Sequence, residues 1–515
     1  MSVSPPFLRS AARTATGSLS VLALLALSAC GGGSSDLAAT SSAEAVASVD
    51  NVDVVALLAD VPTEAVPTFH MAPVDISDPS LVPSDTDAVR TETVLPAMEG
   101  MATARLLPQT VATEAMEARR LLATTPASQM GARAAAVVTV YTPAQIRAAY
   151  KLPAVSAAGV VSTAAARAAL GAGQTIYLVD AYHNPNAFAD LNNYSARLNL
   201  PTCTNVAIPA TAALPLAAAN PASGCTFSVV YAGATAGRTS VAPAYNAGWA
   251  AEIAMDVESA HAIAPLARII LVEATSASLS ALANAITVAN NMGPGVVSMS
   301  FGAGEGNWTA SVDSLFQGKG MQYTASTGDS GAAVNWPAVS TKVLATGGTS
   351  LNFNGSTRTE TVWSGTGGGT SSYTAVPAYQ SALSKTITKR RVADVSSDSD
   401  PYTGQYVGIT VPGGAFGFMS GGGTSIAAPE WAALLAIASA QRAVVNLPVL
   451  TSVHKALYQS VLPNASSYAQ AFLDVTKGAN GTCLTCAAAM GYDASTGLGT
   501  PNGGALLAAL STIQQ

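Results

Sequence analysis

Short apolar segments alternate with helix-like segments along much of this 515-residue chain, and no other feature restricts its fold so strongly. The predicted strands cover Thr175–Asp180, Arg268–Val272, Val296–Ser300, Gln322–Ala325 and Lys342–Thr346. The predicted helices cover Tyr141–Tyr150, Ala187–Leu198, Gly248–Ala264, Leu279–Met292 and Ser311–Gly318. Strands that alternate with helices form a mainly parallel central sheet with helices on both faces. We therefore predict a three-layer α/β fold whose functional residues lie at the carboxyl ends of the strands.

The N-terminus has the order of a signal peptide, which we predict over residues 1–29. Arg9 and Arg13 precede the apolar run Leu19–Leu27, which is too short to span a bilayer. The run ends in Leu-Ser-Ala-Cys, which resembles a bacterial lipobox and predicts lipidation of Cys30 ahead of a flexible Gly/Ser tether. Ordinary signal cleavage is the alternative. We expect an exported protein, held at the cell envelope (outer membrane or surface) or released after processing.

The composition agrees with export. Only 10% of the residues are charged, and the formal net charge is -7. Because the sequence has no basic patch, we expect no nucleic-acid partner. We expect membrane contact only through the lipid anchor, and a monomer. The small number of lysines is typical of an exported protein that tolerates low pH.

The cysteine pattern predicts two disulfide bonds. Without Cys30, four cysteines remain: Cys203, Cys225, Cys483 and Cys486. An even number in an exported chain indicates disulfides, and we expect each bond to close a loop within its own segment. A four-cysteine zinc site is the alternative. It is disfavoured because the two pairs are far apart and only the second pair has ligand-like spacing.

Ser425 lies between a glycine run and an apolar segment that we expect to form a proline-started helix from Pro429. A serine at a helix N-terminus is either a cap or a nucleophile. A nucleophilic serine needs a base, usually a histidine. The four histidines are His70, His183, His261 and His454. None has the sequence setting of a subtilisin histidine, which directs attention to the carboxylates.

Three acidic residues are candidates. Glu252 and Asp256 are four residues apart on the predicted helix Gly248–Ala264, so their carboxyls share one face, whereas Glu258 points away. Two like charges on an apolar helix need a partner or a shared proton. Asp329 stands between glycines just after a predicted strand. This arrangement is also typical of ordinary turns.

Together these residues resemble the sedolisin family of serine-carboxyl peptidases, which have a subtilisin-like fold. Glu252 and Asp256 fall in the family's Glu-x-x-x-Asp-x-Glu helix, Asp329 in its Ser-x-Gly-Asp-x-Gly turn, and Ser425 in its Gly-Thr-Ser-x-x-x-Pro sequence. Further similar segments are Val297–Gly302, Trp336–Ala338, Gly347–Thr349, Glu360–Trp363, Gly367–Gly369, Arg391–Ser396 and Asp400–Pro401. The segments occur in the expected order, which makes the resemblance highly specific.

The resemblance implies a role for each residue. Ser425 is expected to be the nucleophile, Glu252 its general base, and Asp256 the group that holds Glu252. A protonated Asp329 is expected to donate in the oxyanion hole. The reference pKa of glutamate, about 4.3, suits a base in acid, so we expect an exported serine-type endopeptidase with an acidic optimum. Alternatives are a tripeptidyl exopeptidase, a catalytically silent surface-binding lipoprotein, and a conventional subtilisin, which the missing histidine setting disfavours.

The resemblance begins at about Val138, so we expect a peptidase domain over residues 138–515. Residues 30–137 then hold the lipobox cysteine, the tether and either a pro-segment or a linker. The segment Met98–Leu122 could be helical. Members of the family usually carry a larger folded pro-domain. Two readings stay open: a pro-segment released by a cut before Val138, or a retained stalk.

The C-terminal segment suggests a calcium site. Asp474 and Asp493 flank a glycine-containing loop, and carboxylates with nearby carbonyls suit calcium. A pair of Asx-type turns is the alternative. The resemblance implies one calcium ion bound by these two side chains and by the carbonyls of Val475, Ala489 and Gly491.

Overall fold

The computed structural model describes most of the chain after residue 50. The described residues are 51–76, 78, 89–94, 98–124, 136–155, 162–450 and 452–515. The predicted signal peptide, Cys30 and the tether lie outside them. Within the described residues, no helix has the length and apolar character needed to cross a membrane.

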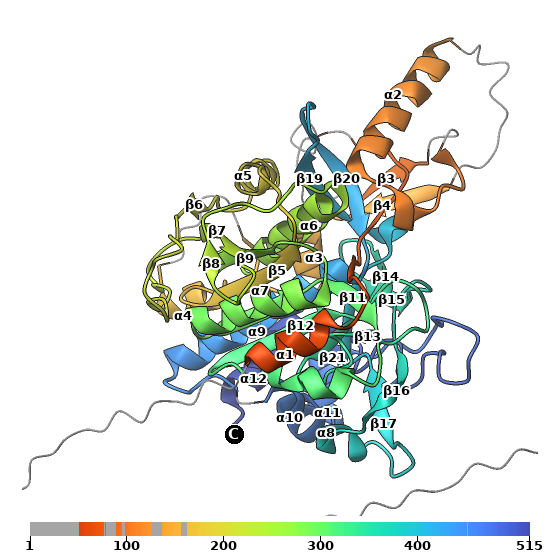
Figure 1. The fold of residues 1–515 in the computed structure, drawn as a ribbon. Coiled ribbons are helices and arrows are strands. Elements are labelled where there is room, and N and C mark those ends of the chain that lie inside the picture. Colours follow the sequence, from red (N-terminus) through yellow and green to blue (C-terminus); the bar gives the residue numbers. More distant parts are fainter. Residues whose placement is uncertain are drawn as a thin grey trace, which may run out of the picture. The chain divides into compact units, whose positions relative to one another are not determined.

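The central sheet is mainly parallel, as predicted (Figure 1). Its strands run in the order β15-β14-β12-β10-β5-β9-β7-β6, and β14 through β6 pair in parallel. The bounds are β5 (Thr175–Ala181), β6 (Thr204–Asn205), β7 (Thr226–Ala232), β9 (Arg268–Ala274), β10 (Gly295–Met299), β12 (Met321–Ser326), β14 (Leu344–Phe353) and β15 (Arg358–Val362). The edge strand β15 is antiparallel to β14, and β18 (Val395–Asp398) also pairs with β14 in parallel.

Helices cover both faces of this sheet. The helices that matter for the site are α5 (Ala187–Arg197), α6 (Ala247–Ile263), α7 (Leu279–Met292) and α9 (Thr424–Val444). Successive strand residues point to opposite faces. Ile176 and Leu178 accordingly belong to the core cluster that holds residues of α6 and α9, whereas Tyr177 and Val179 belong to the cluster of α7. The predicted three-layer arrangement is confirmed.

Three elements described here differ from the sequence prediction. The predicted helix Ser311–Gly318 is a 3-10 helix, η5 (Thr309–Phe316), and the parallel strand β7 had not been predicted. The first turn of α9 also differs, because the helix begins at Thr424 and contains Pro429 in its interior. We had expected the proline to start the helix.

The N-terminal segment adds elements to this core. Helix α1 (Asn51–Ala59) lies along α7, and α2 (Pro108–Thr124) covers most of the segment that we expected could be helical (Figure 1). Two short strands, β1 (Val66–Pro67) and β2 (His70–Met71), lie between these helices in the sequence. They pair antiparallel with β11 (Phe301–Gly304) and β20 (Phe416–Gly422). The segment is therefore joined to the core by backbone pairing.

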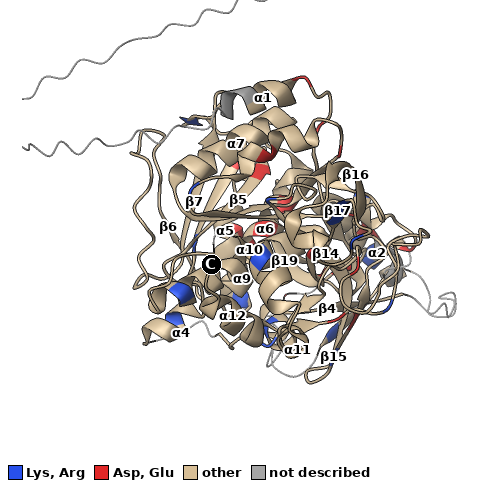
Figure 2. Cartoon of the chain, turned by 90° about the horizontal axis from the view of Figure 1, so that it is seen from below, with Lys and Arg blue, Asp and Glu red and all other residues tan. Residues whose placement is uncertain are grey.

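The cysteines pair within their own segments. Cys203 is bonded to Cys225, and Cys483 to Cys486. Charged residues are sparse along the chain, and most of the described ribbon in Figure 2 belongs to uncharged residues.

Candidate active site

Ser425 is fully buried in the first turn of α9. Gly423, directly before the helix, has a φ of +96°, and a side chain there would collide with the carbonyl oxygen of Thr68. Pro429 has no amide hydrogen and cannot donate to the carbonyl of Ser425 four residues earlier. The hydroxyl of Ser300 donates to that carbonyl instead, at 3.3 Å. Because Pro429 cannot bond to it, the Ser425 carbonyl can accept from Ser300, which directly follows β10.

Helix α6 brings Glu252 and Asp256 to the same buried region. Asn246 caps the helix by accepting from the amides of Gly248 and Trp249, and α6 packs against α9. Both carboxyls are fully buried, and their oxygens accept no hydrogen bond of normal geometry from the described residues. Glu258 lies on another face, as predicted.

Burial and mutual repulsion favour the neutral forms of these carboxyls. Burial raises the pKa of Glu252 well above its usual range, and the charges of Asp256 and Asp180 raise it further. The nearby hydroxyl of Ser425 acts in the opposite direction and lowers this pKa. Burial and Asp180 likewise raise the pKa of Asp256, which the hydroxyl of Ser300 lowers. Glu252 therefore lies close to the Ser425 hydroxyl, inside a cluster of buried carboxyl groups.

Asp180 is a third buried carboxyl that the sequence reasoning did not select. It stands at the carboxyl end of β5 and pairs in register with Glu273 of β9. Burial, together with the charge of Glu273, raises the pKa of Asp180 to about 8. Its place at the end of a predicted strand was the signal that could have identified it.

Asp329 follows β12 and is tied to the start of α9. Its Oδ1 accepts from the amide of Thr424 at 2.9 Å and from the Thr424 hydroxyl at 2.8 Å. Burial raises the pKa of Asp329 to about 7, although both contacts with Thr424 lower it. In acid the carboxyl is therefore protonated and can donate a hydrogen bond.

The described contacts of the four histidines do not include Ser425. His70 Nε2 lies 3.4 Å from Asp329 Oδ2, and its Nδ1 bonds the Thr103 hydroxyl at 2.8 Å. The other three bond elsewhere, His183 to Glu273, His261 to the Pro201 carbonyl, and His454 to Asp394 and the Val343 carbonyl. Burial lowers the pKa of His70 to about 4. The groups near Ser425 that can act as its base are therefore carboxylates.

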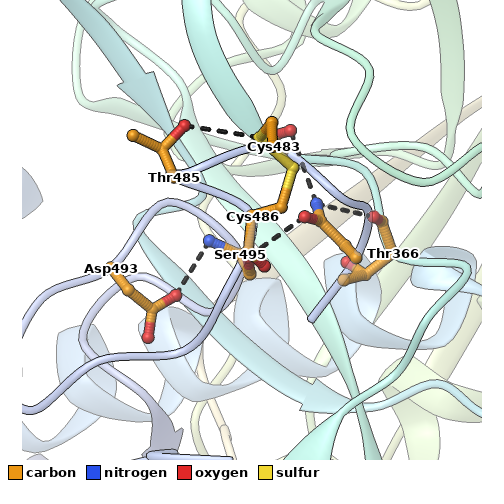
Figure 3. The surroundings of a disulfide bond; sticks show 8 residues. Thr366, Cys483, Thr485, Cys486, Asp493 and Ser495 are labelled. Carbon is orange, nitrogen blue, oxygen red and sulfur yellow. Dashed lines mark hydrogen bonds between the residues drawn. A yellow bond between two sulfur atoms is a disulfide. The ribbon is translucent and has the colours of Figure 1, made fainter. Parts of the chain in front are cut away.

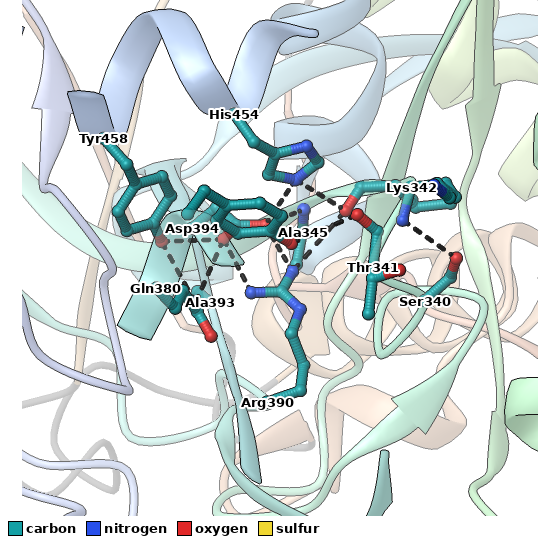
Figure 4. Close-up of polar contacts among 12 residues, drawn as sticks. Ser340, Thr341, Lys342, Ala345, Gln380, Arg390, Ala393, Asp394, His454 and Tyr458 are labelled. Atoms are coloured by element: carbon teal, nitrogen blue, oxygen red, sulfur yellow. Dashed lines mark hydrogen bonds and ion pairs between the residues drawn. The ribbon is translucent and has the colours of Figure 1, made fainter. Parts of the chain in front are cut away.

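A separate buried charge cluster surrounds Asp394 (Figure 4). Arg390 Nη1 donates to Asp394 Oδ1 at 2.7 Å, the Tyr458 hydroxyl donates to the same oxygen at 2.7 Å, and His454 Nε2 lies 3.3 Å from Oδ2. Burial alone would raise the pKa of Asp394, but Arg390 and His454 hold it well below its usual range. This charge is paired and hydrogen-bonded, which is typical of a structural cluster.

The predicted calcium ligands lie around one loop. Asp474 Oδ2 accepts from the amide of Gly491 at 2.8 Å, while its Oδ1 is buried without a partner among the described residues. Asp493 Oδ2 accepts from the amide of Ala489 at 3.3 Å. Burial raises the pKa of Tyr468, and the charges of Asp474 and Asp493 raise it further, so both carboxylates face this side chain.

The disulfide Cys483–Cys486 supports the same loop (Figure 3). The hydroxyl of Ser495 donates to the carbonyl of Cys486 at 2.7 Å, and the amide of Ser495 donates to Asp493 at 2.8 Å. The disulfide is therefore linked to the position of the Asp493 carboxylate.

The chain is similar to known proteins in sequence and in fold. The model of the subtilase family matches residues 244–467, a stretch that includes all four predicted catalytic residues. Kumamolisin from Bacillus sp. (strain MN-32) is 34% identical over 295 residues, which cover 50% of each chain. Sedolisin from Pseudomonas sp. (strain 101) is 30% identical over 213 residues, which cover 36% of this chain and 33% of that protein.

The chain is similar in sequence to two members of the sedolisin family, kumamolisin and sedolisin. The fold agrees, since a solved structure of Pseudomonas sedolisin, a serine-carboxyl proteinase in complex with two molecules of pseudo-iodotyrostatin, superimposes with a TM-score of 0.54 at 24% identity. That match covers 72% of this chain and 98% of the solved chain. In sequence, this chain spans half the length of the curated kumamolisin and a third of the curated sedolisin.

Proposed function

We propose that this protein is a serine-type peptidase that hydrolyses peptide bonds in acid. One observation carries the proposal: Ser425, at the start of α9, lies beside the buried carboxyl groups of α6. None of the described histidine contacts includes Ser425. A buried carboxylate can take a proton from a serine where an imidazole is absent.

Each of the four candidate catalytic residues has its own role in the reaction. Ser425 Oγ attacks the carbonyl carbon of the substrate. Glu252 takes the hydroxyl proton when it is the ionised member of the buried carboxyl cluster, and Asp256 holds Glu252 in place. The backbone amide of Ser425 and the protonated Asp329 donate to the tetrahedral oxyanion. Glu252 then returns the proton to the leaving amine. A water molecule hydrolyses the acyl ester by the same steps and frees Ser425.

We further propose endopeptidase action. An endopeptidase must accept a chain that continues on both sides of the nucleophile. Strands β1 and β2 of the N-terminal segment pair with β11 and β20, so an extended chain fits against both of these strands. A tripeptidyl exopeptidase would instead require a free amino terminus near the nucleophile. Peptides with blocked and free amino termini distinguish the two activities.

A calcium ion fits the loop that contains Asp474 and Asp493. The Oδ1 atom of Asp474 is buried and has no partner among the described residues, as expected for a ligand atom. We propose that Asp474, Asp493 and the carbonyls of Val475, Ala489 and Gly491 hold one calcium ion. The ion would supply positive charge and cross-link the loop, so its role is structural.

Export and a lipid anchor at Cys30 are also part of the proposal. They rest on the sequence of the first 35 residues alone. Mass spectrometry of the protein purified from membranes tests the anchor, because lipidation adds the mass of the acyl chains to Cys30.

The activity is tested by casein digestion across pH with the wild-type protein and two variants, Ser425→Ala and Glu252→Gln. Both variants should lose activity while they keep their fold. Ser439→Ala is a matched control, because it removes another buried hydroxyl from the same helix. Equal digestion by the wild-type protein and both catalytic variants would contradict the proposal.

A further inference from the structure

Residues 365–368, in the loop that follows β15, hold the backbone on both sides of Asp329. The amide of Gly367 donates to the carbonyl of Gly328 at 2.5 Å, directly before Asp329. The carbonyl of the first residue of this segment accepts from the amide of Gly331 at 2.8 Å, two positions after Asp329. The place of the Asp329 carboxyl, the proposed oxyanion donor, therefore depends on segment 365–368.

Asn480 in turn holds segment 365–368. It is only 4% exposed, and its side-chain amide nitrogen donates to the carbonyls of Thr366 at 3.1 Å and Gly368 at 3.4 Å. The backbone carbonyl of Asn480 also lies against Gly331, where a side chain would come within 2.8 Å of its oxygen. Because buried carbonyls that lack a donor are unfavourable, segment 365–368 keeps its conformation only while Asn480 is in place.

The turn closed by the Cys483–Cys486 disulfide fixes Asn480 itself. The carbonyl of Cys486 accepts from the backbone amide of Asn480 at 3.1 Å. The hydroxyl of Ser495 lies 2.7 Å from this carbonyl oxygen and 3.2 Å from the side-chain oxygen of Asn480, so both oxygens share its hydrogen. Since the oxygen of the Asn480 side chain faces this donor, its nitrogen is directed to segment 365–368.

We propose that Asn480 is a positioning residue for the oxyanion hole. It acts through segment 365–368, which fixes the backbone on both sides of Asp329. Its described contacts include no reacting group, so it holds the donor in place without taking part in the chemistry. Because a displacement of about 1 Å can slow an enzymatic reaction about 100-fold, a loosened segment lowers kcat and leaves substrate binding unchanged. This inference rests on the proposed peptidase function and links the Cys483–Cys486 disulfide to the reaction.

The first test compares Asn480→Ala with the wild-type protein on a blocked peptide at about pH 4. We expect kcat to fall by about 10- to 100-fold, because a misplaced donor stabilises the oxyanion less, and KM to change by less than about twofold. Asn284→Ala is the matched control and should keep the wild-type kcat, because it removes a comparably buried amide that bonds the Ala234 carbonyl. A wild-type kcat in Asn480→Ala, or a KM that rises as much as kcat falls, would overturn the inference.

A peptide aldehyde separates oxyanion stabilisation from substrate binding. The Ser425 oxygen bonds to the aldehyde carbon, the C=O double bond becomes a single bond, and the serine proton passes to Glu252. The aldehyde oxygen then lies where the oxyanion forms. Asn480→Ala should raise the Ki of the aldehyde by about 10- to 100-fold, and should leave the Ki of the matching peptide alcohol, which forms no adduct, unchanged. Equal changes for the two inhibitors would overturn the inference.

Hydrogen exchange provides a test that needs no catalysis. The amides of Gly331 and Gly367 should exchange at least about tenfold faster in Ser425→Ala/Asn480→Ala than in Ser425→Ala alone, because their acceptors are no longer held. The amide of Ala345, which donates to a carboxylate of the separate charge cluster in Figure 4, is the internal control and should exchange equally in both chains. Unchanged exchange at both glycines, or equally increased exchange at Ala345, would overturn the positioning role.

Removal of the disulfide tests the remaining link. Cys483→Ser combined with Cys486→Ser, again in the Ser425→Ala chain, should speed exchange at Gly331 and Gly367, as Asn480→Ala does. Exchange that stays slow without the disulfide would overturn its link to the reaction. A wild-type protein that hydrolyses no peptide would contradict the proposed function, while the exchange measurements would still report whether Asn480 holds the backbone beside Asp329.

Discussion

Asp329 accepts two hydrogen bonds from Thr424, one from its amide at 2.9 Å and one from its hydroxyl at 2.8 Å. Thr424 directly precedes the nucleophile, so the loop after β12 and the start of α9 keep a fixed relation. Both bonds reach Oδ1, which leaves Oδ2 available to carry a proton. Thr424 therefore orients the carboxyl as well as binding it.

This relation predicts how activity depends on pH at its upper limit. Because the pKa of Asp329 is about 7, the donor form is present below pH 7 and is lost as the pH rises through that value. Activity should fall over the same range. Asp329→Asn keeps a donor at every pH and should flatten this decline, whereas Asp329→Ala should lower kcat by about 100- to 1000-fold. A decline near neutral pH that persists in the asparagine variant would contradict this assignment.

His70 predicts that the N-terminal segment, which is seated on β20 through β2, is released from this position in acid. Its pKa is about 4 when the segment is seated, against 6.5 for an exposed histidine. The seated state is therefore fully favoured above pH 6.5 and becomes less stable as the pH falls toward 4, because protonation then competes with burial. Thr103 and Trp363 contact the ring, and Asp329 is the charged group that faces it.

The amide of Thr68 donates to the Ser300 carbonyl at 3.2 Å. Hydrogen exchange at this amide in Ser425→Ala measures the release, after correction for the intrinsic effect of pH on exchange. Protection should decrease between about pH 6.5 and pH 4. His70→Phe should remove most of that dependence, because a phenyl ring cannot be protonated. The same pH dependence in both chains would show that another group controls release.

Calcium should stabilise the protein against heat. Chelation should lower the Tm of the wild-type protein, and Asp474→Asn should lower it in the same way and abolish the effect of chelation. Asp60→Asn, which changes an exposed carboxylate of the N-terminal segment, is the control and should keep the full response. A Tm that chelation leaves unchanged would remove the calcium site from the account.

The cluster around Asp394 should be required for stability. Removing this carboxylate would leave Arg390 buried without its ion-pair partner. Asp394→Asn should therefore lower the free energy of unfolding by about 3–5 kcal/mol in denaturant titrations at neutral pH. Because the pKa of Asp394 is held below its usual range, the wild-type contribution should be present at neutral pH and decrease in strong acid. A variant as stable as the wild-type protein would contradict the structural role.

The sequence predicted those parts of the fold that local patterns determine. Helix α7 has the predicted bounds, Leu279–Met292, because its apolar spacing and its Ser278 cap are local signals. The strand β7 was missed because its pattern is interrupted by Ser228, whose hydroxyl donates to the carbonyl of Val206, directly after the neighbouring strand β6. That bond joins residues 22 apart, so no local rule indicates it.

For the candidate site as well, local sequence patterns were predictive and long-range contacts were not. Glu252 and Asp256 could be selected because their spacing on one helix is a local pattern. The place of His70 beside Asp329 could not be predicted, since it depends on the pairing of β2 with β20, more than 200 residues away in the sequence. The sequence of the N-terminal segment has no apolar periodicity that indicates this pairing. The structure also corrects the first turn of α9, where Pro429 lies inside the helix.

The central claim is that a glutamate activates Ser425. Its most direct test is kcat/KM for a blocked peptide between about pH 3 and pH 8 in the wild-type protein and in Glu252→Gln, with Glu258→Gln as a buried control on another face of the same helix. We predict a bell-shaped profile for the wild-type protein and the control, and a loss of about 100- to 10,000-fold in Glu252→Gln. A Glu252→Gln enzyme with wild-type kcat/KM and an unchanged acidic limb would contradict the claim.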